Sequence, residues 1–350
     1  MKMKSFAEQL SAHQHLLSRA LETLSTLDKV VPDSLEGETL LTVDTMQLRY
    51  YAPLRSKTNA KTTLPLLICY ALVNRPYILD LEPKRSLIRD LLATGHPVYL
   101  IDWGYPSATD RNLGLDDYIC DYLHSAVEAV KAHSKQPRID LLGVCQGGVF
   151  SLCYAQLEPE NIRKLITLVT PVDTEVENFT LAQMVRRVDV ATLVKAQGNI
   201  SGDLLNQLYA SLKPLALGLH KQLNLAQNLG EPEQARTFMR MEHWLNDSPD
   251  LAGRGAEEFA QGFFQQNGLM SRSLELGGRR IDLSELKQPI LNAYGSSDHL
   301  VPPASSKGLK SLVAQCESYE ELELKGGHIG AFISNRTRSQ LVKAITEFLE

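Results

Sequence analysis

Three residues that lie far apart in the sequence have the types and the order needed for covalent catalysis. Cys145 lies at the centre of the sequence GVCQG, Asp298 lies in GSSDHLVPP, and His328 lies in KGGHIG. A thiol becomes a nucleophile when a neighbouring base takes its proton, and a carboxylate can hold that base in the right orientation. We therefore predict a catalytic triad, in which His328 takes the thiol proton and Asp298 orients the imidazole and stabilises its charged form.

The sequence around Cys145 predicts a sharp turn between a strand and a helix. Residues 139–142 are an apolar run, and residues 149–157 are rich in apolar side chains with helical spacing. A Gly-x-nucleophile-x-Gly turn at such a junction is a nucleophile elbow, which usually carries serine. Because the turn opens a helix, its position favours the thiolate form of a cysteine.

A cysteine in this place favours acyl transfer over hydrolysis. Exchange between a thioester substrate and an enzyme thiol is nearly isoenergetic, so the acyl group stays activated and a hydroxyl can take it in a downhill step. Such a transfer requires that water be kept out of the site. Because some cysteine-elbow enzymes hydrolyse their substrates, a hydrolase that acts on a thioester, a lactone or a polyester is an alternative.

Further residues near the triad have candidate roles. We expect an oxyanion hole formed by the backbone N–H groups of Gln146 and Val73, the latter from the loop after residues 66–70. His299, next to the predicted acid, either lines the site or has no role there. Cys153 follows the nucleophile on the same predicted helix, so we expect it to be buried and inert.

The elements that must position these residues are strands alternating with helices. Apolar runs, typical of strands buried on both faces, occupy residues 64–72, 97–103, 139–142 and 164–169, and the strand pattern returns at 288–294 and 319–324. Helical spacing is found at residues 86–94, 116–133, 149–157 and 336–349, and residues 40–54 alternate like one or two antiparallel edge strands. Each triad residue follows a predicted strand, and such loops gather at one edge of a parallel sheet.

This pattern predicts an α/β protein with the α/β-hydrolase fold, that is, a mostly parallel sheet with a helical cap insertion. We divide the chain into an N-terminal helix and linker (1–38), the first part of the core (39–172), the cap (173–285) and the second part of the core (286–350). From 173 to 282 we predict helices and no strand. The cap is rich in Leu, Phe and Met, which either exclude water from the site or simply pack in the core. The helix over 4–27 either packs on its own domain or docks a partner subunit.

Composition excludes several classes of protein. The chain has 350 residues, of which 43% are hydrophobic and 22% charged, with a net charge of -5. No dense block of Lys and Arg suggests nucleic-acid binding, no run of about 18 apolar residues predicts a membrane span, and the N-terminus lacks a signal-peptide core. The five cysteines are scattered without a C-x-x-C pair, so we expect reduced thiols in the cytoplasm, with no metal site and no cofactor.

Seven segments together resemble polyhydroxyalkanoate synthases. They are LLGVCQGGVFSL, PLLICYALVNRPYILDL, YLIDWGYP, LVTPVD, DSPD, SSDHLVPP and GGHIG, and the resemblance runs from about residue 40 to residue 350. The short length and the N-terminal helix in place of a long extra domain resemble the class III catalytic subunit more than the class IV one.

The resemblance implies an acyltransferase that polymerises (R)-3-hydroxyacyl-CoA, with 3-hydroxybutyryl-CoA as the expected monomer, into a polyester and releases coenzyme A. It implies Cys145 as the nucleophile, His328 as the general base and Asp298 as a residue that also activates the incoming hydroxyl. It further implies a homodimer, a second non-catalytic subunit, a growing polyester chain and a location on the surface of cytoplasmic polyester granules. A non-catalytic granule-associated scaffold is the alternative from another class, and the intact triad argues against it.

Overall fold

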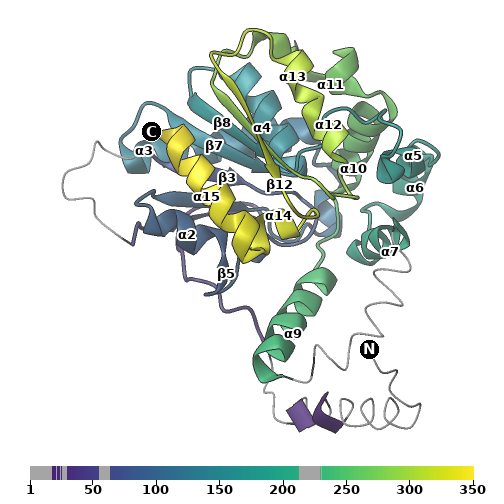
Figure 1. Cartoon of the computed structure of the whole chain (residues 1–350). Coiled ribbons are helices and arrows are strands. Elements are labelled where there is room, and N and C mark those ends of the chain that lie inside the picture. The colour runs from purple at the N-terminus through teal and green to yellow at the C-terminus, as the bar shows by residue number, and fades with distance from the viewer. Residues whose placement is uncertain are drawn as a thin grey trace, which may run out of the picture.

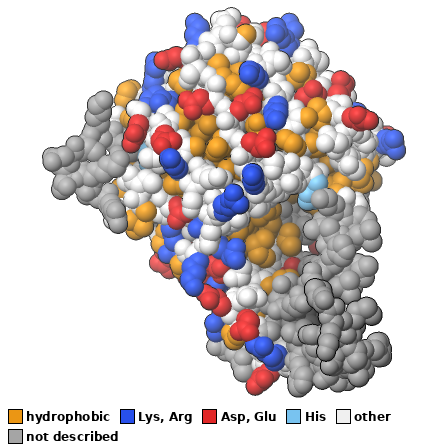
Figure 2. Space-filling view, in the orientation of Figure 1, with side chains coloured by type: hydrophobic (Ala, Val, Ile, Leu, Met, Phe, Trp, Pro, Cys, Tyr) orange, Lys and Arg blue, Asp and Glu red, His pale blue; other side chains and the backbone are white. Residues whose placement is uncertain are grey.

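The computed structural model describes residues 30–54, 64–212 and 231–350, together with residues 18–20, 22, 23, 25 and 229. Of the predicted N-terminal helix over 4–27, residues 18–20, 22, 23 and 25 are described and are helical, and the rest lies outside the described residues. None of the described helices is both long and apolar enough to cross a membrane. On the face shown in Figure 2, acidic and basic side chains are interspersed, and no continuous basic patch forms.

An eight-stranded sheet forms the centre of the molecule, and its strands follow the predicted runs (Figure 1). β1 and β2 are antiparallel to their neighbours, and the six strands from β6 to β12 are parallel. The prediction of a mostly parallel sheet with an antiparallel edge is therefore confirmed. The order across the sheet is β1 (Glu38–Val43), β2 (Met46–Tyr51), β6 (Val98–Asp102), β3 (Leu66–Cys69), β7 (Ile139–Val144), β8 (Ile162–Leu168), β11 (Ile290–Gly295) and β12 (Tyr319–Leu324).

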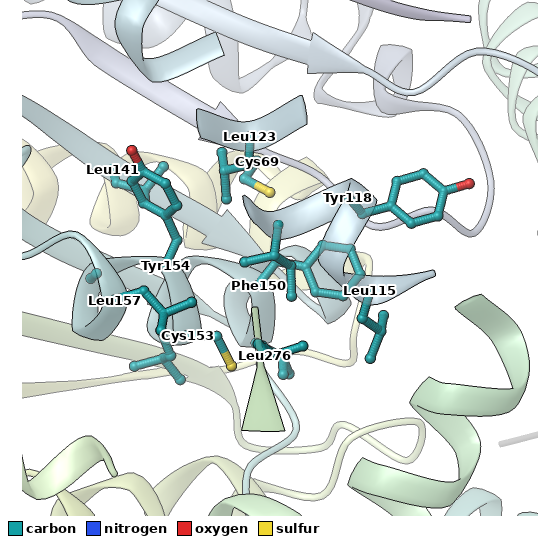
Figure 3. Close-up of a cluster of buried hydrophobic side chains, with 14 of the residues drawn as sticks. Cys69, Leu115, Tyr118, Leu123, Leu141, Phe150, Cys153, Tyr154, Leu157 and Leu276 are labelled. Carbon is teal, nitrogen blue, oxygen red and sulfur yellow. The ribbon is translucent and has the colours of Figure 1, made fainter. Parts of the chain in front are cut away.

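Helices cover both faces of this sheet, which explains why its central parallel strands are mostly apolar, whereas the edge strand β12 carries three glutamates. Leu141 of β7 belongs to a buried cluster with α3 and α4, while the next residue, Leu142, belongs to a cluster with α2 and α15 on the opposite face. Figure 3 shows side chains of the first cluster. The core helices are α2 (Leu87–Ala93), α3 (His124–Ser134), α4 (Gln146–Leu157), α12 (Pro303–Lys307), α13 (Leu309–Leu312), α14 (Gly330–Ile333) and α15 (Asn335–Leu349).

The predicted helix over 116–133 has two parts. It begins as a π-helix, η3 (Asp117–Leu123), and continues as α3. The apolar residues of η3 are buried, so the apolar face was predicted correctly although the hydrogen bonding differs. Short elements complete the core, namely η1 (Pro76–Leu79), β4 (Asp80–Glu82), β5 (Arg85–Ser86), η2 (Ala108–Asn112) and η6 (Leu283–Glu285).

The segment between β8 and β11 is mainly helical, as predicted. Figure 1 shows α5, α6 and α7 close together at one end of the sheet, with α9 extending away from it. The helices are α5 (Thr180–Val185), α6 (Val190–Gln197), α7 (Gly202–Leu212), α9 (Pro232–Asn246), α10 (Gly253–Phe259), the π-helix η5 (Ala260–Gln265) and α11 (Gly268–Ser271).

The prediction that this segment contains no strand is wrong at one place. β9 (Glu275–Leu276) pairs with β10 (Arg279–Arg280) in an antiparallel hairpin. Its turn residues Gly277 and Gly278 have φ angles of 55° and 68°, as the two central positions of a type I′ turn require. The two-residue strands are too short to produce an alternating pattern, and the Gly-Gly pair was the signal that sequence reasoning missed.

The aromatic stripe of the insertion packs into the core. Phe259 and Phe263 have ring centroids 4.7 Å apart, and Phe259 lies 6.1 Å from Phe150 of α4. Phe264 lies 5.8 Å from Phe179 by the same measure. Core packing therefore explains this stripe, which joins the insertion firmly to the helix that follows the elbow.

Candidate active site

The backbone at Cys145 forms the predicted elbow. β7 ends at Val144, α4 begins at Gln146, and Cys145 between them has φ 54° and ψ −121°, a conformation that non-glycine residues rarely adopt. Two hydrogen bonds hold this turn: the Cys145 N–H donates to the Leu168 carbonyl at 2.9 Å, and the Gly148 N–H donates to the Cys145 carbonyl at 2.9 Å. Cys145 thus lies at the N-terminus of a helix, as predicted.

Glycines after the nucleophile let α4 approach the neighbouring strands closely. A Cβ atom at Gly147 would collide with the carbonyl oxygens of Cys69 and Tyr70, at the end of β3. A Cβ atom at Gly148 would collide with the side chain of Thr170, just after β8. The glycines of the elbow sequence are therefore required by the backbone and side-chain atoms that lie against them.

Asp298 and His328 lie together, in the loops that follow β11 and β12. His328 Nδ1 is 2.7 Å from Asp298 Oδ2, and both side chains are buried. The other carboxylate oxygen, Oδ1, accepts the N–H groups of Leu300 and Val301, each at 2.9 Å. Both oxygens of Asp298 are thus engaged, and its orientation toward the imidazole is fixed.

Hydrogen bonds between the two loops fix the distance between the acid and the histidine. The N–H groups of Ser296 and Ser297 donate to the carbonyl oxygens of Leu324 and Gly326, at 2.8 and 3.0 Å. The carbonyl of Gly327 accepts the N–H of Ala331, which lies in the first turn of α14. As expected for a parallel sheet, adjacent strands deliver these side chains to the carboxyl edge.

Cys145 interacts with the imidazole of His328. Because Nδ1 faces Asp298, Nε2 is the ring nitrogen left for the thiol. Burial alone would lower the pKa of His328, but the charges of Asp298 and Cys145, together with hydrogen bonds to both, outweigh burial and raise it to about 10. The structure therefore brings together the three residues that the sequence analysis singled out.

Two tyrosines that sequence reasoning missed lie near the nucleophile. Burial raises the pKa of Tyr70 and of Tyr209, and negative charge on Cys145 raises both further. Tyr70 follows β3, whereas Tyr209 belongs to α7, whose residues Leu208 and Leu212 pack against the same core cluster as Cys145. A helix of the insertion therefore packs against the same core cluster as Cys145, which the sequence could only suggest.

The two predicted oxyanion donors flank a contact between α4 and the loop after β3. Gln146 contributes the first N–H of α4, which has no partner within the helix. Its side-chain Oε1 accepts the N–H of Leu72 at 3.0 Å, which fixes the residue before Val73. No backbone hydrogen bond among the described residues uses the Val73 N–H. That these two N–H groups form an oxyanion hole stays a prediction.

The remaining candidates differ in their surroundings. Cys153 is fully buried, lies among apolar side chains in Figure 3, and has a pKa raised by that burial. His299 is partly buried beside the acid and has interactions of its own, so its role in the site stays a prediction. Asp102, also at a strand end, forms an ion pair with Arg75 at 2.7 Å. This ion pair joins the end of β6 to the loop after β3, so we assign it a structural role.

Family models and curated relatives match nearly the whole chain. Residues 65–334 match the alpha/beta hydrolase fold family, and residues 3–91 match the family described as the N-terminus of poly-beta-hydroxybutyrate polymerase (PhaC). Poly(3-hydroxyalkanoate) polymerase subunit PhaC of Thiocystis violacea is 41% identical, over 98% of this chain and 96% of its own. The subunit of the same name from Allochromatium vinosum is 45% identical, over 82% of this chain and 80% of its own.

Solved structures share the fold at low sequence identity. One is from work on LipS and LipT, two metagenome-derived lipolytic enzymes, with a TM-score of 0.53, 13% identity and coverage of 86% of this chain and 96% of that chain. A monoacylglycerol lipase from Paleococcus ferrophilus gives a TM-score of 0.50 at 15% identity, over 87% and 98% of the two chains. These similarities support the α/β-hydrolase architecture alone.

Proposed function

Because this chain belongs to the poly(3-hydroxyalkanoate) polymerase PhaC family, we propose that it polymerises (R)-3-hydroxyacyl-CoA into a polyester and releases coenzyme A. The single observation that carries the proposal is a cysteine at the elbow, within reach of a histidine that a buried carboxylate orients. We take 3-hydroxybutyryl-CoA as the first monomer to test. The activated thioester and the triad supply the chemistry, so the proposal includes no metal and no cofactor.

The first step is transfer of the acyl group to Cys145. The Cys145 sulfur attacks the carbonyl carbon of the substrate thioester while His328, whose pKa is raised, holds the proton. The carbonyl oxygen of the substrate becomes an oxyanion, which the N–H groups of Gln146 and Val73 would stabilise. The C–S bond to coenzyme A breaks, His328 gives its proton to the departing thiolate, and the acyl group remains on Cys145 as a thioester.

The second step forms the ester bond. The hydroxyl of another 3-hydroxyacyl unit attacks the acyl thioester, and neutral His328 accepts its proton. Cys145 leaves as a thiolate, beside a histidine that is again protonated. Both oxygens of Asp298 already accept hydrogen bonds, one from His328 and the other from two backbone N–H groups. We therefore infer that Asp298 acts on the hydroxyl through His328.

Covering of the nucleophile favours transfer over hydrolysis. Cys145 is only partly exposed, and Tyr209 of α7 packs against the same core cluster. A thioester in such a place meets less water than one on an open surface, so an alcohol held in the site can compete for it. The helical insertion thus supports a synthase, even though its Phe259 stripe belongs to the core.

The setting of the enzyme is also a proposal. We propose that this chain is the catalytic subunit of a class III synthase, that it forms a homodimer, and that it works with a second non-catalytic subunit. Relatives that it matches over most of their length are named as PhaC subunits, which supports an assembly of more than one chain. Because the polymer product is insoluble, we place the working enzyme in the cytoplasm, on the surface of polyester granules.

One assay tests the proposed function against its alternatives. The purified chain is incubated with (R)-3-hydroxybutyryl-CoA, alone and with a candidate second subunit, while free thiol and turbidity are followed. We expect thiol release together with turbidity from polymer. Thiol release with soluble 3-hydroxybutyrate and no polymer would show a hydrolase instead. No thiol release under either condition would favour a non-catalytic scaffold.

A further inference from the structure

The segment that follows α9 joins two parts of the site that are distant in sequence. Asn74 Nδ2 donates to Ser248 Oγ at 2.7 Å, and Ser248 Oγ lies 2.7 Å from Asn206 Oδ1 of α7. A serine hydroxyl has one proton to donate. Because the Leu245 carbonyl lies farther away, at 3.5 Å, the proton of Ser248 goes to Asn206. The bonds thus run in one direction, from the loop after β3 through Ser248 to α7.

At the first end of this chain of bonds lies the loop that contains Val73. Asn74 has φ 57°, in the left-handed region that asparagine tolerates better than most residues. The next residue is also fixed, because the Trp244 indole N–H donates to the Arg75 carbonyl at 2.8 Å. With Leu72 bound to Gln146 on the other side, residues on both sides of Val73 are held in place. Two of these three hydrogen bonds, those to Trp244 and Ser248, come from the end of α9 and the residues just after it.

At the other end lies α7. Its first residue, Gly202, donates its N–H to Asp250 Oδ1 at 3.0 Å, and a Cβ atom there would collide with the Ser248 carbonyl. Asn206 lies one turn later and Tyr209 nearly another turn on, so the three residues share a face of the helix. The face that rests on Ser248 therefore continues to Tyr209, which packs against the same core cluster as Cys145.

We propose that Ser248 is a positioning residue that couples α7 to the loop containing Val73, so that the oxyanion donor and the cover over Cys145 are set together. This inference rests on the proposed function, since an oxyanion forms only when a carbonyl is attacked. If the hydroxyl is lost, Asn74 and Asn206 lose their common partner. The Val73 N–H then samples positions away from the oxyanion while the thiol keeps its histidine.

Two reactions of the same sulfur separate this role from general damage. Acylation of Cys145 by (R)-3-hydroxybutyryl-CoA passes through an oxyanion, whereas alkylation by iodoacetamide does not. In Ser248→Ala and in Asn74→Gly, which keeps the left-handed backbone available, we expect single-turnover acylation to fall about 10- to 100-fold, less than the loss of a whole oxyanion donor. Alkylation should stay within about twofold of wild type. The double variant should be no slower than the slower single variant, because both remove the same chain of bonds.

The conservative and control variants sharpen the test. Asn206→Ala should slow acylation like Ser248→Ala, and Asn206→Asp, which keeps an acceptor oxygen, should restore most of the rate. Asn246→Ala removes an exposed amide that bonds only within α9 and should change neither reaction. Wild-type acylation in Ser248→Ala, or equal loss of acylation and alkylation, would overturn the coupling. A wild-type protein that is alkylated but never acylated would overturn the proposed function itself.

Discussion

Gln146 and Leu72 are 74 positions apart in the sequence, and a 3.0 Å hydrogen bond joins the side-chain Oε1 of Gln146 to the Leu72 N–H. Gln146 is the residue after the nucleophile, and Leu72 precedes the predicted second oxyanion donor. Both residues are buried. This one contact therefore links the start of α4 to the loop after β3, across the place where a substrate carbonyl would lie.

We predict that Gln146→Ala destabilises the protein by about 1–3 kcal/mol, because it leaves the buried Leu72 N–H without its partner. Urea unfolding monitored by circular dichroism measures this change. Gln156→Ala is the matched control on the same helix, since that amide bonds only to the side chain of Glu285 at 3.1 Å. We expect the control to cost less than about 0.5 kcal/mol. Equal losses of unfolding free energy in the two variants would show that the hydrogen bond to Leu72 stabilises the protein no more than the contact of Gln156 does.

A second prediction concerns Gly147. In Gly147→Ala, the new methyl group meets the Cys69 and Tyr70 carbonyl oxygens, so α4 or the loop after β3 must move. We expect a loss of about 1–3 kcal/mol in the free energy of unfolding, together with slower acylation of Cys145. Gly330→Ala, whose methyl group would meet nothing within 4 Å, should unfold like wild type. The packing account fails if Gly147→Ala is as stable as that control.

The pH dependence of stability follows from His328. Its pKa is raised from 6.5 to about 10 in the folded protein, so the folded chain holds a proton that the unfolded chain has lost between these values. The resulting stabilisation is complete below about pH 6.5 and disappears as the pH rises through about 10, with a slope of at most about 1.4 kcal/mol per pH unit. Urea unfolding of wild type and His328→Gln between about pH 7 and 9 should show a shallower decline in the variant. Parallel profiles would contradict the raised pKa.

The role of Asp298 predicts how its amide variant behaves. Since the charge of Asp298 helps to raise the pKa of His328, Asp298→Asn should lower that pKa and weaken proton transfer in both steps. We expect acylation and chain growth to slow together, by about 10²- to 10⁴-fold. Rapid-quench measurement of the acyl-enzyme and of polymer separates the two steps. If acylation survives while chain growth is lost, Asp298 acts directly on the incoming hydroxyl.

The sequence was sufficient to predict the sheet and the turn at Cys145, because both depend on local signals. Apolar runs mark the central parallel strands, and the elbow glycines around Cys145 mark the turn. The partners of Asn74 and Ser248 were beyond prediction, because they depend on where α9 ends in space. The size of the rise in the pKa of His328 was beyond prediction for a similar reason, since burial lowers that pKa and two neighbouring charges raise it. The hairpin at Gly277 was missed because its strands have two residues each.

The most direct measurement of the central claim is identification of the acylated residue. The protein is mixed with isotopically labelled (R)-3-hydroxybutyryl-CoA, quenched in acid and digested, and the peptides are analysed by mass spectrometry. We predict a 3-hydroxybutyryl group, and longer oligomers of it, on the peptide that contains Cys145. That peptide also contains the buried Cys153, so fragmentation must place the label, and Cys153→Ala should still carry it while Cys145→Ala should not. A label on any other residue, or turnover that continues in Cys145→Ala, would contradict the account.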